Sequence, residues 1–116
     1  VGVDIHGVHN WNTELPTFAS WYNPHYYPKI AALAYQSSPE AYLDGWESPV
    51  LLIHGDDDRN VPFTESVVLS EQLRERGVYF EQLIFPDEVH GFLLQDNWVR
   101  CMEATFEFID RHIGEK

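Results

Sequence analysis

Two polar segments, each following an apolar run, contain the residues best suited to acid–base chemistry. Three aspartates at 56–58 follow the run at 50–53, and His90 follows the run at 78–85. A carboxylate that accepts the Nδ1 proton of a histidine fixes the ring tautomer and stabilises the imidazolium that forms when Nε2 takes a proton. The two segments are about 30 residues apart, the length of one strand–helix–strand unit. The sequence therefore predicts a histidine that is oriented by one of these aspartates.

The surrounding segments predict the elements that would hold these residues. Residues 1–5, 50–53 and 78–85 have the branched and aromatic composition of β-strands, and Pro86 stops the third. The run at 50–53 is apolar throughout, as in a parallel strand covered on both faces. A helix is predicted over 63–76, because Pro62 precedes its first turn and Gly77 suits the position after its last.

A further helix is predicted over 97–113, ending at Gly114, because apolar residues recur in it every three or four positions. The stripe expected to face the core consists of Trp98, Cys101, Met102, Thr105, Ile109 and Ile113. Residues 6–38 show no clean period and are predicted to be irregular, with short helical turns at 30–35. Residues 37–46 are predicted to form a short helix with Pro39 in its first turn.

These elements predict an α/β fold with about three parallel strands and crossover helices. In such sheets the functional groups collect in loops beyond the carboxyl ends of the strands. Adjacent strands lie roughly 5 Å apart, so an aspartate after the second strand can reach a histidine after the third. The chain of 116 residues is one domain or part of one.

Composition argues against several kinds of partner. The chain has 19 Asp and Glu against 7 Lys and Arg, a formal charge of −12. Binding to nucleic acids or anionic membranes relies on clustered basic residues, so we expect neither. No apolar run is long enough to span a bilayer. The single cysteine, Cys101, allows no internal disulfide, which favours a reducing compartment such as the cytoplasm.

The segments PVLLIHGDDDRNVPF at 49–63 and GVYFEQLIFPDEVHGF at 77–92 resemble part of a known enzyme family. They are similar to the C-terminal half of the α/β-hydrolase domain in the prolyl oligopeptidase family of serine peptidases. In the family motif the acid stands two places before an Asn or Arg that precedes Val, which matches Asp58 and not its two neighbours. The family's histidine matches His90. The resemblance implies a Ser-Asp-His mechanism that acts on short peptides.

The same resemblance implies which residues contact the peptide substrate. Asn60 matches the residue with which family members contact the substrate backbone. Val8, Trp11 and Val61 match an apolar pocket for the side chain on the acyl side of the cleaved bond. We expect no cofactor.

The family's nucleophile is a serine in a Gly-x-Ser-x-Gly turn that precedes the acid and the histidine. None of the serines in this chain has that context. Because the chain also starts at Val1 within a predicted strand, we expect the upstream part of the hydrolase domain to precede it and the isolated piece to be inactive. An edge of the strand at 1–5 would then lack its neighbour, which predicts self-association. Two alternatives stay open, an esterase of the same fold and a hydrolase-derived module that only binds.

Other polar residues have structural explanations. Asp56 and Asp57 are predicted to form the turn by bonding nearby backbone amides. His54 is predicted to be a buried histidine with satisfied hydrogen bonds, and Cys101 a small core residue. The group Asp4, His6 and His9 lacks the ligand spacing of zinc or calcium sites, so no metal is predicted. The aromatic cluster of Trp21, Tyr22, Tyr26, Tyr27 and Tyr35 is predicted to serve packing or a subunit contact.

Overall fold

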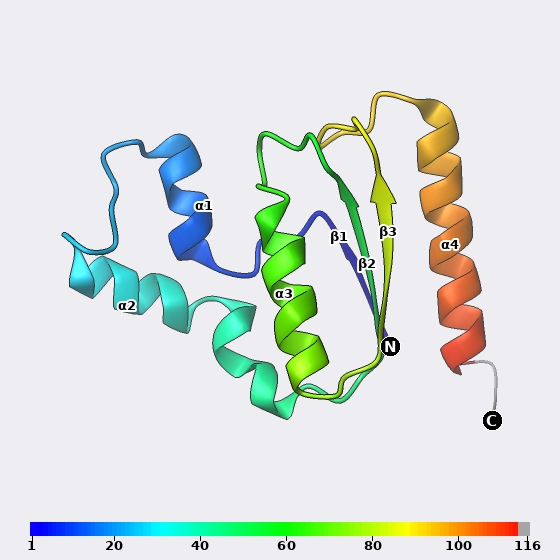
Figure 1. The fold of residues 1–116 in the computed structure, drawn as a ribbon, viewed down its shortest axis with the longest axis horizontal. Helices are drawn as coiled ribbons and strands as arrows, with labels where there is room; N and C mark the ends of the chain where they lie inside the picture. Colours follow the sequence, from blue (N-terminus) through cyan, green and yellow to red (C-terminus); the bar gives the residue numbers. More distant parts are fainter. Residues whose placement is uncertain (114–116) are drawn as a thin grey trace.

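A parallel three-stranded sheet forms the centre of the molecule (Figure 1), which is known here from a computed structural model that describes residues 1–113. The strands are β1 (Gly2–Ile5), β2 (Val50–Gly55) and β3 (Phe80–Phe85), in the order β1-β2-β3. This confirms the predicted fold class. The strand β2 continues two residues beyond the predicted end, because His54 and Gly55 still pair with β3.

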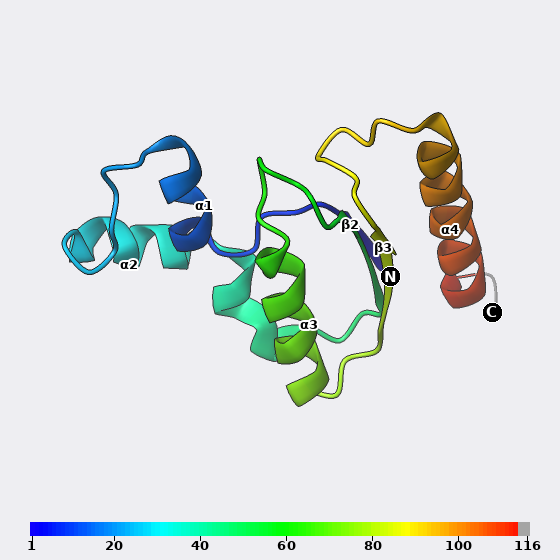
Figure 2. The ribbon, with the colours of Figure 1, turned by 45° about the horizontal axis from the view of Figure 1, so that its top comes forward.

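Helices cover both faces of the sheet, with α3 (Thr64–Glu75) on one face and α4 (Gln95–Ile113) on the other (Figure 2). The side chains of β2 alternate between the two faces, which is why the whole strand is apolar and buried. The core on the α4 side contains Leu51, Ile53, Phe85, Phe92, Cys101 and Phe108. The core on the α3 side contains Leu43, Val50, Leu52, Leu69 and Leu73.

The end of α3 explains a difference at the start of β3. Gly77 has a φ of 69° and donates its N–H to the carbonyl of Arg74, while the N–H of Val78 donates to the carbonyl of Leu73. These two bonds form the Schellman motif that commonly ends a helix. Because Val78 completes this motif, the strand begins at Phe80 and not at residue 78 as predicted.

The prediction of irregular chain between residues 6 and 38 was wrong in part, although the helical turns predicted at 30–35 do lie within a helix. Two helices form there, α1 (Trp11–Phe18) and α2 (Pro28–Gln36). The side chain of Asn10 caps α1, but that helix contains Pro16 and buries only Glu14, so it has no apolar stripe to reveal it. The predicted short helix at 37–46 is a 3-10 helix, η1 (Pro39–Gly45).

The buried face of α4 differs from the predicted stripe. Cys101 and Phe108 are fully buried, which confirms Cys101 as a core residue. Met102 and Ile113, both predicted to face the core, are 40% and 50% exposed. The helix is therefore turned so that Phe108, which the predicted stripe omitted, packs on the sheet. The predicted end at Gly114 lies outside the described residues.

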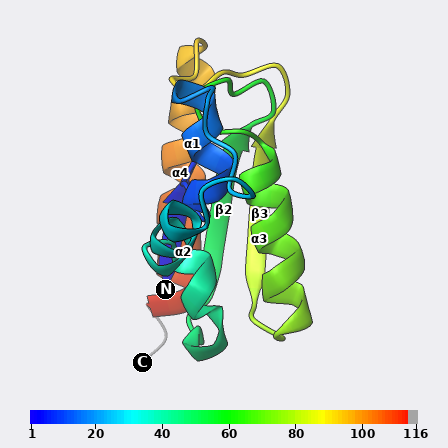
Figure 3. The same ribbon diagram turned by 90° about the vertical axis from the view of Figure 1, so that its left-hand side faces the viewer.

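The carboxyl ends of the three strands meet at one rim of the sheet. Ile5 pairs with Ile53, and Gly55 pairs with Phe85, so the loops that follow start within two residues of one another in register. Figure 3 shows the loops after β2 and β3 at the same end of the molecule. In the described part of the chain, no helix is both long and apolar enough to cross a membrane.

Candidate active site

Asp58 lies in the loop after β2, and its buried carboxylate accepts four hydrogen bonds. Oδ1 accepts the backbone N–H groups of Asn60 at 2.8 Å and Val61 at 2.9 Å. Oδ2 lies 2.7 Å from Nδ1 of His90 and 3.1 Å from Nε2 of His54. The loop therefore satisfies a buried charge completely, as buried charges require.

These hydrogen bonds control the ionisation of Asp58. Burial alone would raise the pKa of its carboxyl group, since it disfavours the charged form. The N–H of Val61, the ring of His90 and the N–H of Asn60 outweigh that effect, and the pKa lies below its ordinary value. Asp58 is consequently a carboxylate at neutral pH and a permanent acceptor for its histidine partners.

His90 lies in the loop after β3, and its side chain is 32% exposed. Because Nδ1 contacts the Asp58 carboxylate, Nδ1 carries the proton in the neutral ring, and Nε2 has a free lone pair. Within residues 1–113, Nε2 has no hydrogen-bond partner. The ring is thus oriented by a carboxylate at one nitrogen and open to a proton at the other, which is the arrangement of a general base.

His54 is buried with both ring nitrogens bonded, which confirms the prediction for it. Its Nε2 lies 3.1 Å from both Asp58 Oδ2 and the carbonyl of Val61. Both atoms are acceptors, so Nε2 carries the proton and Nδ1 accepts from the hydroxyl of Ser66 at 2.7 Å. The sequence did not reveal that His54 also holds Asp58 in place, four residues further on.

Two hydrogen bonds join the loop after β2 to the loop after β3, close to the Asp58–His90 pair. The carbonyl of Glu88 accepts the N–H of Asp57 at 3.0 Å. The Asp56 carboxylate accepts the N–H of Asp87 at 2.7 Å, so the predicted bond to a nearby amide was wrong, because the partner belongs to the other loop. Asp57 also bonds no nearby amide with its side chain, which lies 3.7 Å from the Arg59 guanidinium.

Glu88 anchors the loop that carries His90, a role that no pattern in the sequence indicated. Its buried carboxylate accepts the N–H groups of Leu93 and Leu94 and the amide N–H of Asn97. These bonds, that of Asn97 foremost, hold the pKa of Glu88 below its ordinary value. The loop from Glu88 to the start of α4 therefore folds back on the Glu88 carboxylate, to which it donates three hydrogen bonds. This restricts where His90 can lie.

His6 follows β1 and reaches the same rim from the third strand. The centroid of its ring is 3.8 Å from that of His90. Its φ of 44° lies in the left-handed region, which is unfavourable for residues other than glycine. No pattern in the sequence pointed to this contact, because it depends on the pairing of β1 with β2.

The residues predicted to contact substrate occupy different environments. Asn60 is exposed at the rim beside Asp58, whereas Val61 is buried and its backbone bonds Asp58 and His54. Trp11 lines a hollow with residues of α2, and Val8 lines another with residues of β1. Their role in one apolar pocket stays a prediction.

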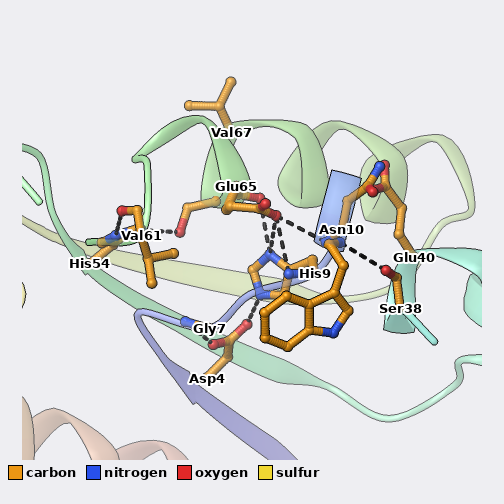
Figure 4. Close-up of polar contacts among 12 residues, drawn as sticks. Asp4, Gly7, His9, Asn10, Ser38, Glu40, His54, Val61, Glu65 and Val67 are labelled. Atoms are coloured by element: carbon orange, nitrogen blue, oxygen red, sulfur yellow. Dashed lines mark hydrogen bonds and ion pairs between the residues drawn. The ribbon is translucent and has the colours of Figure 1, made fainter. Parts of the chain in front are cut away.

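A second buried histidine lies behind the rim (Figure 4). The ring of His9 contacts the Asp4 carboxylate through Nε2 and the carbonyl of Glu65 through Nδ1 at 3.0 Å. Burial opposes its charge, but Asp4 and Glu65 outweigh burial and raise the pKa of His9. Among residues 1–113, no three His, Cys, Asp or Glu side chains gather as metal ligands. This cluster ties the segment after β1 to the first turn of α3.

The parallel sheet, with an acid and a histidine in successive loops at its carboxyl rim, has the α/β-hydrolase fold. The chain superimposes on the acylaminoacyl peptidase of Pyrococcus horikoshii with a TM-score of 0.79 at 23% identity, over 96% of this chain and 19% of that one. A puromycin-hydrolyzing peptidase of Mycobacterium tuberculosis gives 0.75 at 26% identity, over 98% of this chain and 18% of that one.

The chain belongs to the prolyl oligopeptidase family, because a sequence model of that family matches residues 1–116. It is 33% identical over 82 residues to dipeptidyl-peptidase 5 of Porphyromonas gingivalis, which covers 71% of this chain and 12% of that protein. The chain therefore spans only a small part of the length of such relatives.

Proposed function

We propose that this chain supplies the acid and the base of a serine peptidase that cleaves short peptides. His90 acts as the general base and then as the general acid, and Asp58 orients it. The contact of 2.7 Å between His90 Nδ1 and Asp58 Oδ2 carries this proposal. Membership of the prolyl oligopeptidase family supports it.

In this proposal the proton follows a definite path. His90 Nε2 accepts the proton of the attacking serine hydroxyl, and the Asp58 carboxylate stabilises the resulting imidazolium. The imidazolium then gives this proton to the leaving amine of the peptide, after which water repeats the cycle on the acyl-enzyme. Among residues 1–113 no serine hydroxyl bonds His90, so a part of the protein outside this sequence would supply the nucleophile. The isolated chain would then be inactive.

Asn60 would bind the substrate backbone, since its exposed side chain lies two residues from Asp58. Val8, Trp11 and Val61 would bind the side chain on the acyl side of the cleaved bond. The strand β1 pairs only with β2 in the described sheet, so its other edge would bind the upstream part of the hydrolase domain. In the isolated chain this edge would promote self-association.

The test uses the full-length protein and a serine-directed fluorophosphonate probe. We expect His90→Ala to abolish labelling, because the serine loses its base. We expect Asp58→Asn to lower kcat for a short peptide by about 10⁴-fold, since an amide NH₂ facing the His54 and His90 N–H groups favours the wrong tautomer of His90. Asp57→Asn is the matched control, because Asp57 is exposed and does not contact His90.

Each outcome separates the proposal from its rivals. Unchanged labelling and hydrolysis in Asp58→Asn would refute the pairing. Absence of labelling in the unmodified full-length protein would favour a module that binds without catalysing. Hydrolysis of short esters with no cleavage of matched peptides would identify an esterase of the same fold.

A further inference from the structure

His6 lies against His90, and the mechanism above gives it no role. The two ring centroids are 3.8 Å apart, and the ring planes are inclined by 38°. A contact this close covers one face of the His90 ring. Of the three loops at the rim, the loop after β1 thus supplies a direct neighbour of the proposed base.

We propose that His6 is a positioning residue, which fixes the plane of the His90 ring and offers a neutral surface to the imidazolium. This inference rests on the proposed function, because the ring plane matters only if His90 transfers a proton. His6 itself exchanges no atom with the substrate.

A single hydrogen bond does not fix the His90 ring. The contact with Asp58 holds Nδ1, but the ring can still turn about the line that joins the two bonded atoms. The rest of the fold covers the ring only in part, since the side chain is 32% exposed. A flat neighbouring ring prevents this rotation, because turning would drive the edge of the His90 ring into it. The contact with His6 therefore sets where Nε2 points, and small errors in that direction are costly in catalysis.

His6 can act as such a support because the core holds it from behind. Its ring meets that of Phe92 edge to face, with centroids 6.2 Å apart. Phe92 is buried and packs against Trp98 of α4. The backbone N–H of His6 donates to the carbonyl of Ile53 at 2.8 Å, which continues the pairing of β1 with β2.

The backbone of His6 is strained where the side chain meets His90. A φ of 44° suits glycine, but it falls on His6 and not on the adjacent Gly7. Strained residues persist where the surrounding structure over-determines them, and they cluster at functional sites. A side chain held in this conformation against the proposed base matches that pattern.

The charges around the pair favour a neutral His6. The titratable groups whose charges act on the two rings are Asp58 and His54 from the β2 side and Glu14 from α1. Burial first, and then the neighbouring His90 ring, hold the pKa of His6 below its ordinary value, although Asp58 opposes this. A neutral ring presents a π face to the His90 imidazolium, which attracts the cation, whereas a charged ring would repel it.

The test follows the proton shared by His90 and Asp58 in NMR spectra of the full-length protein. This Nδ1 proton gives a low-field resonance, which is assigned by its loss in His90→Gln. We expect its exchange with water to be about tenfold faster in His6→Gly, because the ring is free to turn. His6→Phe keeps a flat neighbour and should stay within about twofold of wild type, as should the control His25→Phe in an exposed loop.

Two results would overturn the inference. One is slow exchange in His6→Gly, which would show that the contact with His6 does not hold the ring. The other is fast exchange in His6→Phe at an unchanged melting temperature, which would show that a flat neighbour is not what matters.

Hydrolysis by the full-length protein separates this inference from the proposed function. We expect His6→Gly to lower kcat about tenfold at unchanged KM, and His6→Phe to retain kcat at neutral pH. If Asp58→Asn keeps full activity, the proposed function fails whatever the NMR result. If Asp58→Asn is inactive but His6→Gly keeps its kcat, only the role of His6 fails.

Discussion

A methyl group placed on Gly55 would press apart the two loops that hold Asp58 and His90. An added Cβ would stand 2.4 Å from the carbonyl oxygen of Glu88 and 2.8 Å from its carbonyl carbon. Carbon and oxygen atoms in contact approach to about 3.3 Å, so the backbone at Glu88 must retreat by roughly 1 Å. Backbone cannot give way as a flexible side chain can, so Gly55→Ala should destabilise the fold.

The cost of this substitution has three parts. Overpacking a filled site costs about 1–3 kcal/mol. The bond from the Asp57 N–H to the Glu88 carbonyl, now 3.0 Å, would lengthen beyond hydrogen-bonding range, at a cost of about 1 kcal/mol. Alanine lowers the conformational entropy of the unfolded chain, which stabilises the folded state by up to about 1 kcal/mol. The expected loss in the free energy of unfolding is therefore about 1–4 kcal/mol.

Equilibrium unfolding in urea measures this loss, and Gly91→Ala is the matched control. Gly91 is next to His90, but a Cβ there meets no atom within 4 Å, so its effect should stay within about 0.5 kcal/mol. In the full-length protein, Gly55→Ala should also lower kcat, since the displaced loop carries His90 away from Asp58. Equal midpoints for the two variants, with the low-field His90 resonance intact in both, would refute the reasoning from the close approach.

Two further predictions concern stability. The pKa of His9 is raised above 6.5 in the folded chain. The charged His9 ring therefore contributes fully to the free energy of unfolding below pH 6.5, and this contribution is lost as pH rises through the raised pKa. Urea unfolding over a pH series should thus show the gap between wild type and His9→Gln shrinking toward alkaline pH; a gap that widens would contradict this. Phe108 is fully buried, so Phe108→Ala should cost about 3–5 kcal/mol in the same assay. Met102→Ala, on the exposed side of the helix, should cost under about 1 kcal/mol, and equal losses would show that the assigned face of α4 is wrong.

Local patterns were sufficient for the central elements and for a pairing of His90 with one of the aspartates at 56–58, whereas the choice of Asp58 among them came from the family resemblance. The apolar run of β2 predicts a strand covered on both faces, and Gly77 predicts the end of α3. Both predictions depend only on residues that are neighbours in the sequence. Asp58 and His90 could be placed at one rim because parallel strands direct all their following loops to the same edge.

Side-chain partners across the fold depended on the tertiary structure. No pattern in the sequence indicated the contact of His6 with His90, the hydrogen bond of His54 to Asp58 or the close approach of Gly55 to Glu88. The helix α1 was missed because it has no apolar stripe. The buried face of α4 was misassigned because amphipathic spacing alone does not set the rotation of a helix on a sheet. The sequence gives only the order of the residues. Contacts between side chains of distant segments form only when the strand register brings those segments within a few ångströms.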